Sequence, residues 1–346
     1  MTQAPCVRSL QDWMLNAGAD LLTEADALPI TVTRQQGPKA NCYITSPKIA
    51  WFDYAADEVR DQFFLKIALK TLSHLANWTG LDQNIIVGNF PISTNVWSSA
   101  QNSLIFKACQ TQCQRSTNRF IFVRNLLSYQ HEQLITELNS MGFVVLPARV
   151  IYEFDLRQGM KNKPSHLMRD LGALKKSTLQ VTHLQHIDDQ IASHFQHLYD
   201  LIYIQKHSAY NAKYTPAFFK DMINSNRMKA LSLQNERGEI VAFALLHQIA
   251  DTLTVPALGY FENASGVGIY RLLFASIFKH TLENQLMLNY SSGAGDFKRK
   301  RGAQGRLEYT AVKAPHSFMN WKTRLVQWIA KKTKHMNEQD LIRRGA

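Results

Sequence analysis

The second half of the chain groups short apolar strands around one long helix, and this order limits the folds open to it. Between residues 228 and 314 the pattern predicts three strands, a helix, a strand, a glycine-rich loop and a last strand. In chain order these elements are MKALSLQ, EIVAFALLHQIA, TLTVPALGYF, IYRLLFASIFKHTLEN, LMLNYS and RLEYTAVKA. Strands joined in this way form an α/β layer with a mixed sheet.

Three local signals sharpen this prediction. Thr215 followed by Pro216 is typical of the start of a helix, which we expect to run to about residue 225. Gly238 can supply the positive φ of a turn between two strands. Pro256 cannot donate to a strand ladder and therefore predicts an edge or a bulge in its strand.

The first half of the chain also alternates strands with helices. Its predicted strands are LPITVTRQ, NCYITS, QNIIVGNF, RFIFVRNL and GFVVLPARVIYEFDL. Apolar residues at helical spacing predict helices over residues 57–78, 98–114 and 129–141. With 346 residues, the chain is long enough for two such layers.

A polar, basic stretch at residues 157–177 separates the two halves and contains Gly159 and Pro164 as helix breakers. We therefore predict a first lobe over residues 1–158, a second lobe over residues 159–318 and a tail over residues 319–346.

The charge of the chain favours acidic partners. Lys and Arg number 39 against 27 Asp and Glu, which gives a net charge of +12. Nucleotide cofactors, tRNA and anionic lipid all fit such a surplus. Four cysteines match neither a disulfide framework nor a zinc pattern, and no segment approaches the roughly 20 apolar residues of a membrane span. We expect a cytoplasmic protein, with peripheral contact at the inner face of the membrane as a further option.

The histidines do not indicate a metal site. His183, His186, His194 and His197 form two H-x-x-H pairs, but neither an HExxH motif nor a cysteine pair accompanies them. We expect no bound metal.

Two glycine-bearing motifs flank the long helix of the second half. The first, NASGVG, places Asn263, Gly266 and Gly268 between a strand and the start of the helix. Backbone N–H groups and the positive helix end can face an anion there, because glycine leaves the approach open. The alternative interpretation is that the two glycines only make a turn.

The second motif, GAGDFKRKRG, sets small residues against four consecutive cations at 298–301. Residues 259–305 hold seven of the 16 glycines, which favours close approach of a ligand to the backbone. Phe297 and Gly302 bracket the cations, so we predict that Lys298 and Arg301 are held in place to neutralise a phosphate or carboxylate. Arg299 and Lys300 would then point to solvent. The alternative is a solvated loop.

Together these motifs resemble the second half of an acyltransferase domain of the GNAT superfamily. The FKRKRG run is similar, more narrowly, to the Fem-type and BioF2-like branch. The likeness spans about residues 187–318, and residues 25–156 resemble the degenerate first repeat of those two-lobed proteins. The turn departs from the family pattern at Asn263, where the family has Gln or Arg. The resemblance implies two tandem GNAT-like lobes, the first of them degenerate.

The resemblance also implies an activity. An N-acyltransferase of this kind passes an acyl group from acyl-CoA, a cosubstrate rather than a bound cofactor, to an amine by direct attack without a metal. The alternative donor is an aminoacyl-tRNA, with a peptide or lipid as acceptor, as in Fem-type proteins. A third alternative is a catalytically silent member that binds a ligand or a membrane.

The resemblance assigns roles to particular residues. The backbone at Ala257, Leu258 and Gly259 would stabilise the oxyanion, and the residues Asn263, Gly266, Val267 and Gly268 would hold the pyrophosphate of the donor. For the general base, the sequence offers the candidates Asp296, Glu262, His207 and His247. Tyr290 would protonate the leaving thiolate.

The C-terminal tail has the pattern of a basic amphipathic helix. Trp321, Leu325, Trp328 and Ile329 share one face, and residues 315–346 carry seven Lys and Arg against two Asp and Glu. Such a helix can lie on an anionic membrane or bind RNA. The alternative is that it docks on the second lobe.

Overall fold

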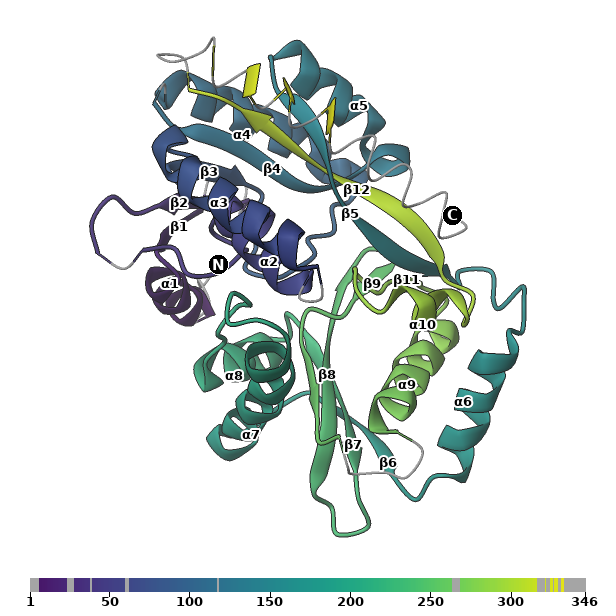
Figure 1. Ribbon diagram of the computed structural model, residues 1–346. Coiled ribbons are helices and arrows are strands. Elements are labelled where there is room, and N and C mark those ends of the chain that lie inside the picture. The colour runs from purple at the N-terminus through teal and green to yellow at the C-terminus, as the bar shows by residue number, and fades with distance from the viewer. Residues whose placement is uncertain are drawn as a thin grey trace. The chain divides into compact units, whose positions relative to one another are not determined.

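The chain divides into two compact lobes, each built from separate stretches of sequence (Figure 1). The N-terminal lobe contains residues 10–150, 207–213 and 307–346, and the C-terminal lobe contains residues 1–9, 151–206 and 214–306. The computed structural model describes residues 6–23, 28–37, 39–59, 62–116, 118–262, 268–315, 321, 324–325, 327–328 and 331–332.

Five strands of the N-terminal lobe pair side by side. In spatial order they are β1 (Ala19–Thr23), β2 (Pro29–Thr33), β3 (Asn84–Val87), β4 (Phe120–Leu127) and β12 (Gln304–Lys313). β3 and β4 run parallel, and the other pairs run antiparallel. The helical segments are α1 (Cys6–Asn16), a π-helical turn (Ile49–Asp53), α2 (Tyr54–Glu58), α3 (Phe63–Thr79), a 3₁₀ turn (Ser99–Gln101), α4 (Asn102–Arg115) and α5 (Ser128–Ser140).

Strand β4 shows why this lobe has two cores. Side chains alternate between the two faces of a strand. Ile121 and Val123 pack in one cluster with residues of α4 and α5, whereas Phe120 and Phe122 pack in a second cluster with Trp51 of the π-helical turn. The run of apolar residues in β4 is therefore that of a strand buried on both faces.

The strands of the C-terminal lobe also pair in a mixed parallel and antiparallel arrangement. In spatial order they are β6 (Gln180–Leu184), β7 (Lys229–Gln234), β8 (Ile240–Ile249), β9 (Thr252–Thr254), β11 (Met287–Asn289) and the end of β5 (Val144–Asp155). β10 (Leu258–Tyr260) pairs with β8. The helical segments are α6 (Ser165–Lys176), α7 (Asp189–Asp200), a π-helical segment (Leu201–His207), α8 (Pro216–Asn224), α9 (Ile269–Glu283) and α10 (Gly295–Arg299).

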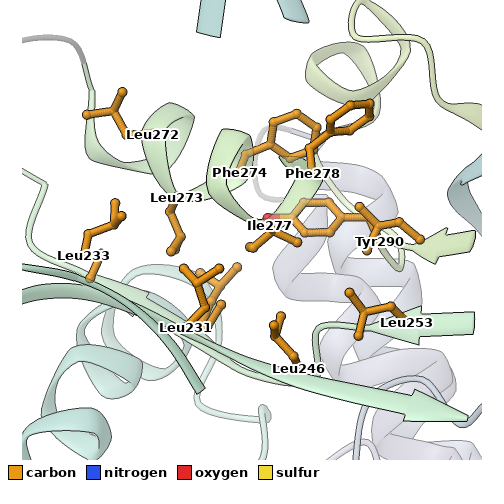
Figure 2. Close-up of a cluster of buried hydrophobic side chains, with 14 of the residues drawn as sticks. Leu231, Leu233, Leu246, Leu253, Leu272, Leu273, Phe274, Ile277, Phe278 and Tyr290 are labelled. Atoms are coloured by element: carbon orange, nitrogen blue, oxygen red, sulfur yellow. The ribbon is translucent and has the colours of Figure 1, made fainter. Parts of the chain in front are cut away.

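Helices cover both faces of the C-terminal sheet, with α6 and α9 on one side and α7 and α8 on the other (Figure 1). Figure 2 shows leucines of the strands facing Leu273 and Ile277 of α9. On the opposite face, Phe243 of β8 stacks on Phe195 of α7 with ring centroids 4.1 Å apart. The α/β class with a mixed sheet, expected from the sequence, is confirmed.

The local signals of the sequence have definite outcomes. The Thr215 hydroxyl caps α8 by accepting from the Phe218 N–H, Gly238 has φ +77°, and Pro256 lies between β9 and β10. These three predictions are confirmed. The strand expected over residues 41–46 is wrong, because the N–H groups of Thr45 and Ser46 turn back to the Cys42 carbonyl.

The bounds of the lobes differ from those expected at residues 158 and 318. Residues 151–158 belong to the C-terminal lobe rather than to the first, whereas residues 165–176 form α6 of the C-terminal lobe, inside its expected bounds. Residues 307–313 pair with β4 and so belong to the N-terminal lobe. The alternation of apolar and polar residues predicts a strand, but it does not indicate which lobe the strand joins.

The predicted C-terminal basic helix lies mainly outside the described residues. Trp321 and Trp328, which are described, are both exposed. Within the part of the chain that the structure describes, every helix is too short or too polar to cross a membrane.

Candidate functional site

Two parallel strands of the C-terminal lobe separate after a short paired stretch. Residues Thr252–Thr254 of β9 pair with Met287–Asn289 of β11. After Pro256 the chain continues as β10, which pairs with β8, while the Tyr290 N–H donates to the Tyr152 carbonyl of β5. The two paths therefore diverge, and we call the opening between β10 and Tyr290 the fork.

Backbone groups of β10 point into this fork. The Leu245 N–H donates to the Ala257 carbonyl, and the Phe261 N–H donates to the Val241 carbonyl. Ladder bonds alternate along an antiparallel strand, so every second residue of β10 faces away from β8. The N–H groups of Leu258 and Tyr260 are therefore directed to the fork. Leu258 is one of the three residues that the sequence offered for the oxyanion contact.

Gly259, also proposed for the donor site, has a packing role. A side chain at this position would overlap the backbone of Leu198 and Tyr199 in α7. The glycine thus lets α7 approach β10 closely, and it holds Leu258 in place beside the fork.

We expect Gly259→Ala to lower the free energy of unfolding by about 1–3 kcal/mol or more, because the obstructing atoms are helix backbone. Gly172→Ala is the matched control, since Gly172 lies in α6 with open space around its Cα. That change should raise stability by up to about 1 kcal/mol through helix propensity. Urea unfolding of both variants measures the difference, and a neutral Gly259→Ala would remove the packing role.

The far end of the fork leads to the start of α9. Gly268 precedes this helix with φ +89°, and no side chain caps the helix there. The first backbone N–H groups of such a helix favour an anion. Asn263, Gly266 and Val267, predicted to share this contact, lie outside the described residues, so their roles stay predictions.

A buried carboxylate holds two arginines beside α9. Asp170 of α6 has no exposed side-chain surface, and its Oδ1 accepts from Nη2 of Arg271 at 2.6 Å. Its Oδ2 accepts from Nε of Arg301, also at 2.6 Å. The Arg271 side chain lies in the first turn of α9 and is 40% exposed. Arg271 and Asp170 were not predicted from the sequence, although an arginine three residues after Gly268 was a signal for the first of them.

Arg301 is directed inward. Its side chain is 5% exposed, its Nη1 donates to the Phe297 carbonyl, and its guanidinium lies 3.4 Å from the Phe297 ring centroid. The expectation that Arg301 is held in a fixed position is met by these contacts. The phosphate contact expected of it has no support here, since the charge is paired with Asp170.

Lys298 is also directed inward and is bonded to protein groups. Its ammonium is buried and donates to the carbonyls of Tyr290, Ser291 and Ser292 at 2.6, 3.2 and 2.8 Å. A lysine has three N–H donors, and these three bonds use them. Lys298 therefore fastens the loop after β11, and the predicted direct contact with a phosphate is not supported. Arg299, expected to point to solvent, donates to the Tyr152 hydroxyl and pairs with Asp296.

Tyrosines surround the fork. Tyr290 interacts electrostatically with Tyr203, Tyr260 and Tyr270, and burial raises the pKa of Tyr290 well above its ordinary value. Burial likewise raises the pKa of Tyr270 to about 12. The Tyr290 hydroxyl is buried and has no hydrogen-bond partner of normal geometry in the described part of the chain. It keeps its proton at neutral pH, so it can donate a hydrogen bond, whereas its high pKa makes it a weak acid for a thiolate.

The candidate bases lie in different surroundings. Glu262 pairs with Lys206, and Asp296 pairs with Arg299 on the surface. His247 of β8 lies opposite Thr254 of β9. Burial lowers the pKa of His247, so its imidazole is neutral at pH 7 and can accept a proton. His207 belongs to the N-terminal lobe. Of these four, Glu262 and His247 lie in or next to the strands of the fork.

In the N-terminal lobe, the region after β3 is filled by the lobe's own polar groups. The Trp97 ring lies where a side chain at Gly88 would be. Arg124 is half-buried and donates to the Asn89 side chain and to the carbonyls of Ile44 and Ser93. Protein groups therefore occupy these donors, and the degeneracy expected of the first lobe stays a prediction.

Solved structures share this fold. The structure of L-PGS from Bacillus licheniformis has a TM-score of 0.56 and 12% identity, and the match covers 92% of each chain. The C-terminal domain of a putative lysylphosphatidylglycerol synthetase from Agrobacterium fabrum has a TM-score of 0.53 and 11% identity, over 94% of this chain and 96% of that one. No protein-family model and no curated protein matches the sequence.

At these identities the likeness establishes the fold. The match extends over both lobes, so the two-lobed architecture expected from the motifs is confirmed.

Proposed function

We propose that the C-terminal lobe is an N-acyltransferase that binds acyl-CoA in the fork and passes the acyl group to an amine. The observation that carries this proposal is the direction of the Leu258 and Tyr260 N–H groups, which leave the β8 ladder and turn into the opening. An extended donor lying there would form strand-like hydrogen bonds with β10. Its carbonyl oxygen would meet a backbone donor of the kind that stabilises an oxyanion.

The reaction needs little from side chains. The amine nitrogen attacks the thioester carbon, a C–N bond forms, the C–S bond breaks, and the thiolate leaves with the electron pair. The amine proton passes to a base, for which His247 and Glu262 are the candidates, and a proton returns to the sulfur. Holding the two reactants together supplies much of the rate. In this scheme Tyr290 steadies the sulfur or the carbonyl by a hydrogen bond.

Phosphates of the donor would lie at the start of α9. The helix end attracts an anion, and the partly exposed Arg271 adds a cation in the first turn. Asp170 fixes this guanidinium from the buried side, which reduces the entropy lost when a phosphate binds.

The second candidate is transfer from an aminoacyl-tRNA to a lipid or peptide. The net charge of +12 favours it, because RNA binding depends on neutralising phosphates. The fold is also shared with the C-terminal domain of a putative lysylphosphatidylglycerol synthetase.

A thermal-shift comparison separates these candidates. CoA and acetyl-CoA at about 100 times their Kd should stabilise the protein by about 2.7 kcal/mol, because they bind the native state. Pantetheine, which lacks the phosphates of CoA, should give a much smaller shift. Arg271→Gln should weaken CoA binding about tenfold or more. Lys279→Gln, on the exposed side of the same helix, is the matched control and should leave the shift unchanged.

A shift with charged tRNA and none with CoA esters would favour the second candidate. A thermal shift with CoA, but no release of free CoA from acetyl-CoA with any of a panel of amines, would favour the catalytically silent alternative.

A further inference from the structure

Helix α3 of the N-terminal lobe exposes most of its large apolar side chains. Phe64 is 86% exposed and Trp78 is 83% exposed. The other exposed large apolar residues of this helix are Phe63, Leu65, Ile67, Leu72 and Leu75. Single exposed apolar residues are common, but a contiguous group of this size marks a surface that meets something apolar.

The inward side of α3 is made from small residues. Ser73 and Ala76 are its buried residues, and the Ser73 hydroxyl donates to Asp53 at 2.7 Å. At 100° per residue, Phe64, Ile67 and Trp78 lie on the opposite side of the helix from these two. The helix thus rests on the lobe through small groups and turns its aromatic side outward.

The charges of α3 are all of one sign. Lys70 lies at one edge of the outward side, Lys66 lies nearer to the side of Ser73, and the helix contains no Asp or Glu. With 17 residues it is about 26 Å long. An aromatic and aliphatic face bordered by lysines is the pattern of a helix that lies in the plane of a membrane interface.

We propose that α3 is a docking surface for an anionic lipid bilayer, with Phe64, Ile67 and Trp78 inserted among the acyl chains and the lysines at the headgroups. The charge of the helix, and the +12 of the whole chain, complement anionic headgroups. This surface is independent of the fork and does not rest on the proposed activity.

A second copy of the chain fits this face less well. A two-fold contact through α3 would bring two positively charged helices together, and the helix offers no carboxylate to offset their charge. Like charges brought together in a contact oppose association.

The test is cosedimentation with vesicles of phosphatidylglycerol and phosphatidylcholine, at low and high salt. Phe64→Ser or Trp78→Ser should each weaken binding about tenfold or more, because each removes an aromatic group that the bilayer would bury. Lys66→Gln and Lys70→Gln should each weaken it about fivefold on anionic vesicles and leave binding to neutral vesicles unchanged. Quenching by brominated lipids should fall on Trp78→Phe.

Two matched controls keep the test specific. Tyr129→Ser removes an exposed aromatic residue of α5 in the same lobe, and Trp328→Ser removes one from the C-terminal segment. Both should bind as the unaltered protein does, and the melting temperatures of all variants should agree. The proposal fails if vesicles do not bind, or if only Trp328→Ser reduces binding. It also fails if the α3 variants change the oligomeric state of the protein, measured by analytical ultracentrifugation, without changing its affinity for vesicles.

Discussion

Replacing Lys298 by methionine should destabilise the protein by about 3–5 kcal/mol, because three backbone carbonyls of Tyr290, Ser291 and Ser292 lose the buried donor that they share. Methionine keeps much of the volume of the lysine stem, so the loss reports the ammonium rather than a cavity. The melting temperature should fall by about 10 °C. Calorimetry measures this change, and circular dichroism at low temperature checks that the variant still folds.

Lys300→Met is the matched control, since Lys300 is exposed two residues further along the same run. We expect a change of less than about 0.5 kcal/mol there. Equal and small effects at both positions would show that the run 298–301 is a solvated loop, which was the alternative interpretation of this motif.

Asp170→Asn should be as damaging as Lys298→Met. The substitution keeps the shape of the side chain but removes the charge that two guanidinium groups share, and Arg301 would stay buried beside a neutral amide. Breaking a buried ion pair from one side costs about 3–5 kcal/mol. Urea unfolding measures the loss, and CoA binding should weaken together with it if Asp170 positions Arg271.

The pair of Asp189 and Lys220 provides the comparison for Asp170. Their atoms are 2.8 Å apart, but the Asp189 side chain is 85% exposed. Asp189→Asn should therefore cost less than about 1 kcal/mol, since water screens an exposed pair. A loss at Asp170 no larger than at Asp189 would contradict the buried network.

The sequence predicted the C-terminal lobe well because its signals are local. A threonine cap, a turn glycine and a proline that interrupts a strand act within a few residues, and all three lie where they were expected. The fork follows from the same segment, since it depends on where β9 ends and β10 begins.

Roles of charged residues were harder to predict. The spacing of the FKRKRG run indicated that Lys298 and Arg301 are fixed, yet it could not name their partners. Asp170 lies 131 residues before Arg301, and only the fold brings the two together. A buried cation looks the same in a sequence whether it meets a ligand or a protein carboxylate.

For helix α3, the sequence predicted the helix but not which of its sides faces the lobe. Its apolar residues recur at helical spacing, which correctly predicted a helix, but periodicity says only that residues share a side. Which side faces inward depends on what the lobe offers, and here Asp53 and the small residues Ser73 and Ala76 set it.

The pairing of β12 with β4 has a consequence for synthesis of the chain. Residues 307–313 close the edge of a strand that ended at residue 127, so this edge stays open while the intervening residues are translated. At about 5–20 residues per second, the wait is about 10–40 s. An unpaired strand edge is a template for aggregation during that time. A fragment that stops at residue 158 would keep the edge open permanently, so the N-terminal lobe depends on the last part of the chain to be made.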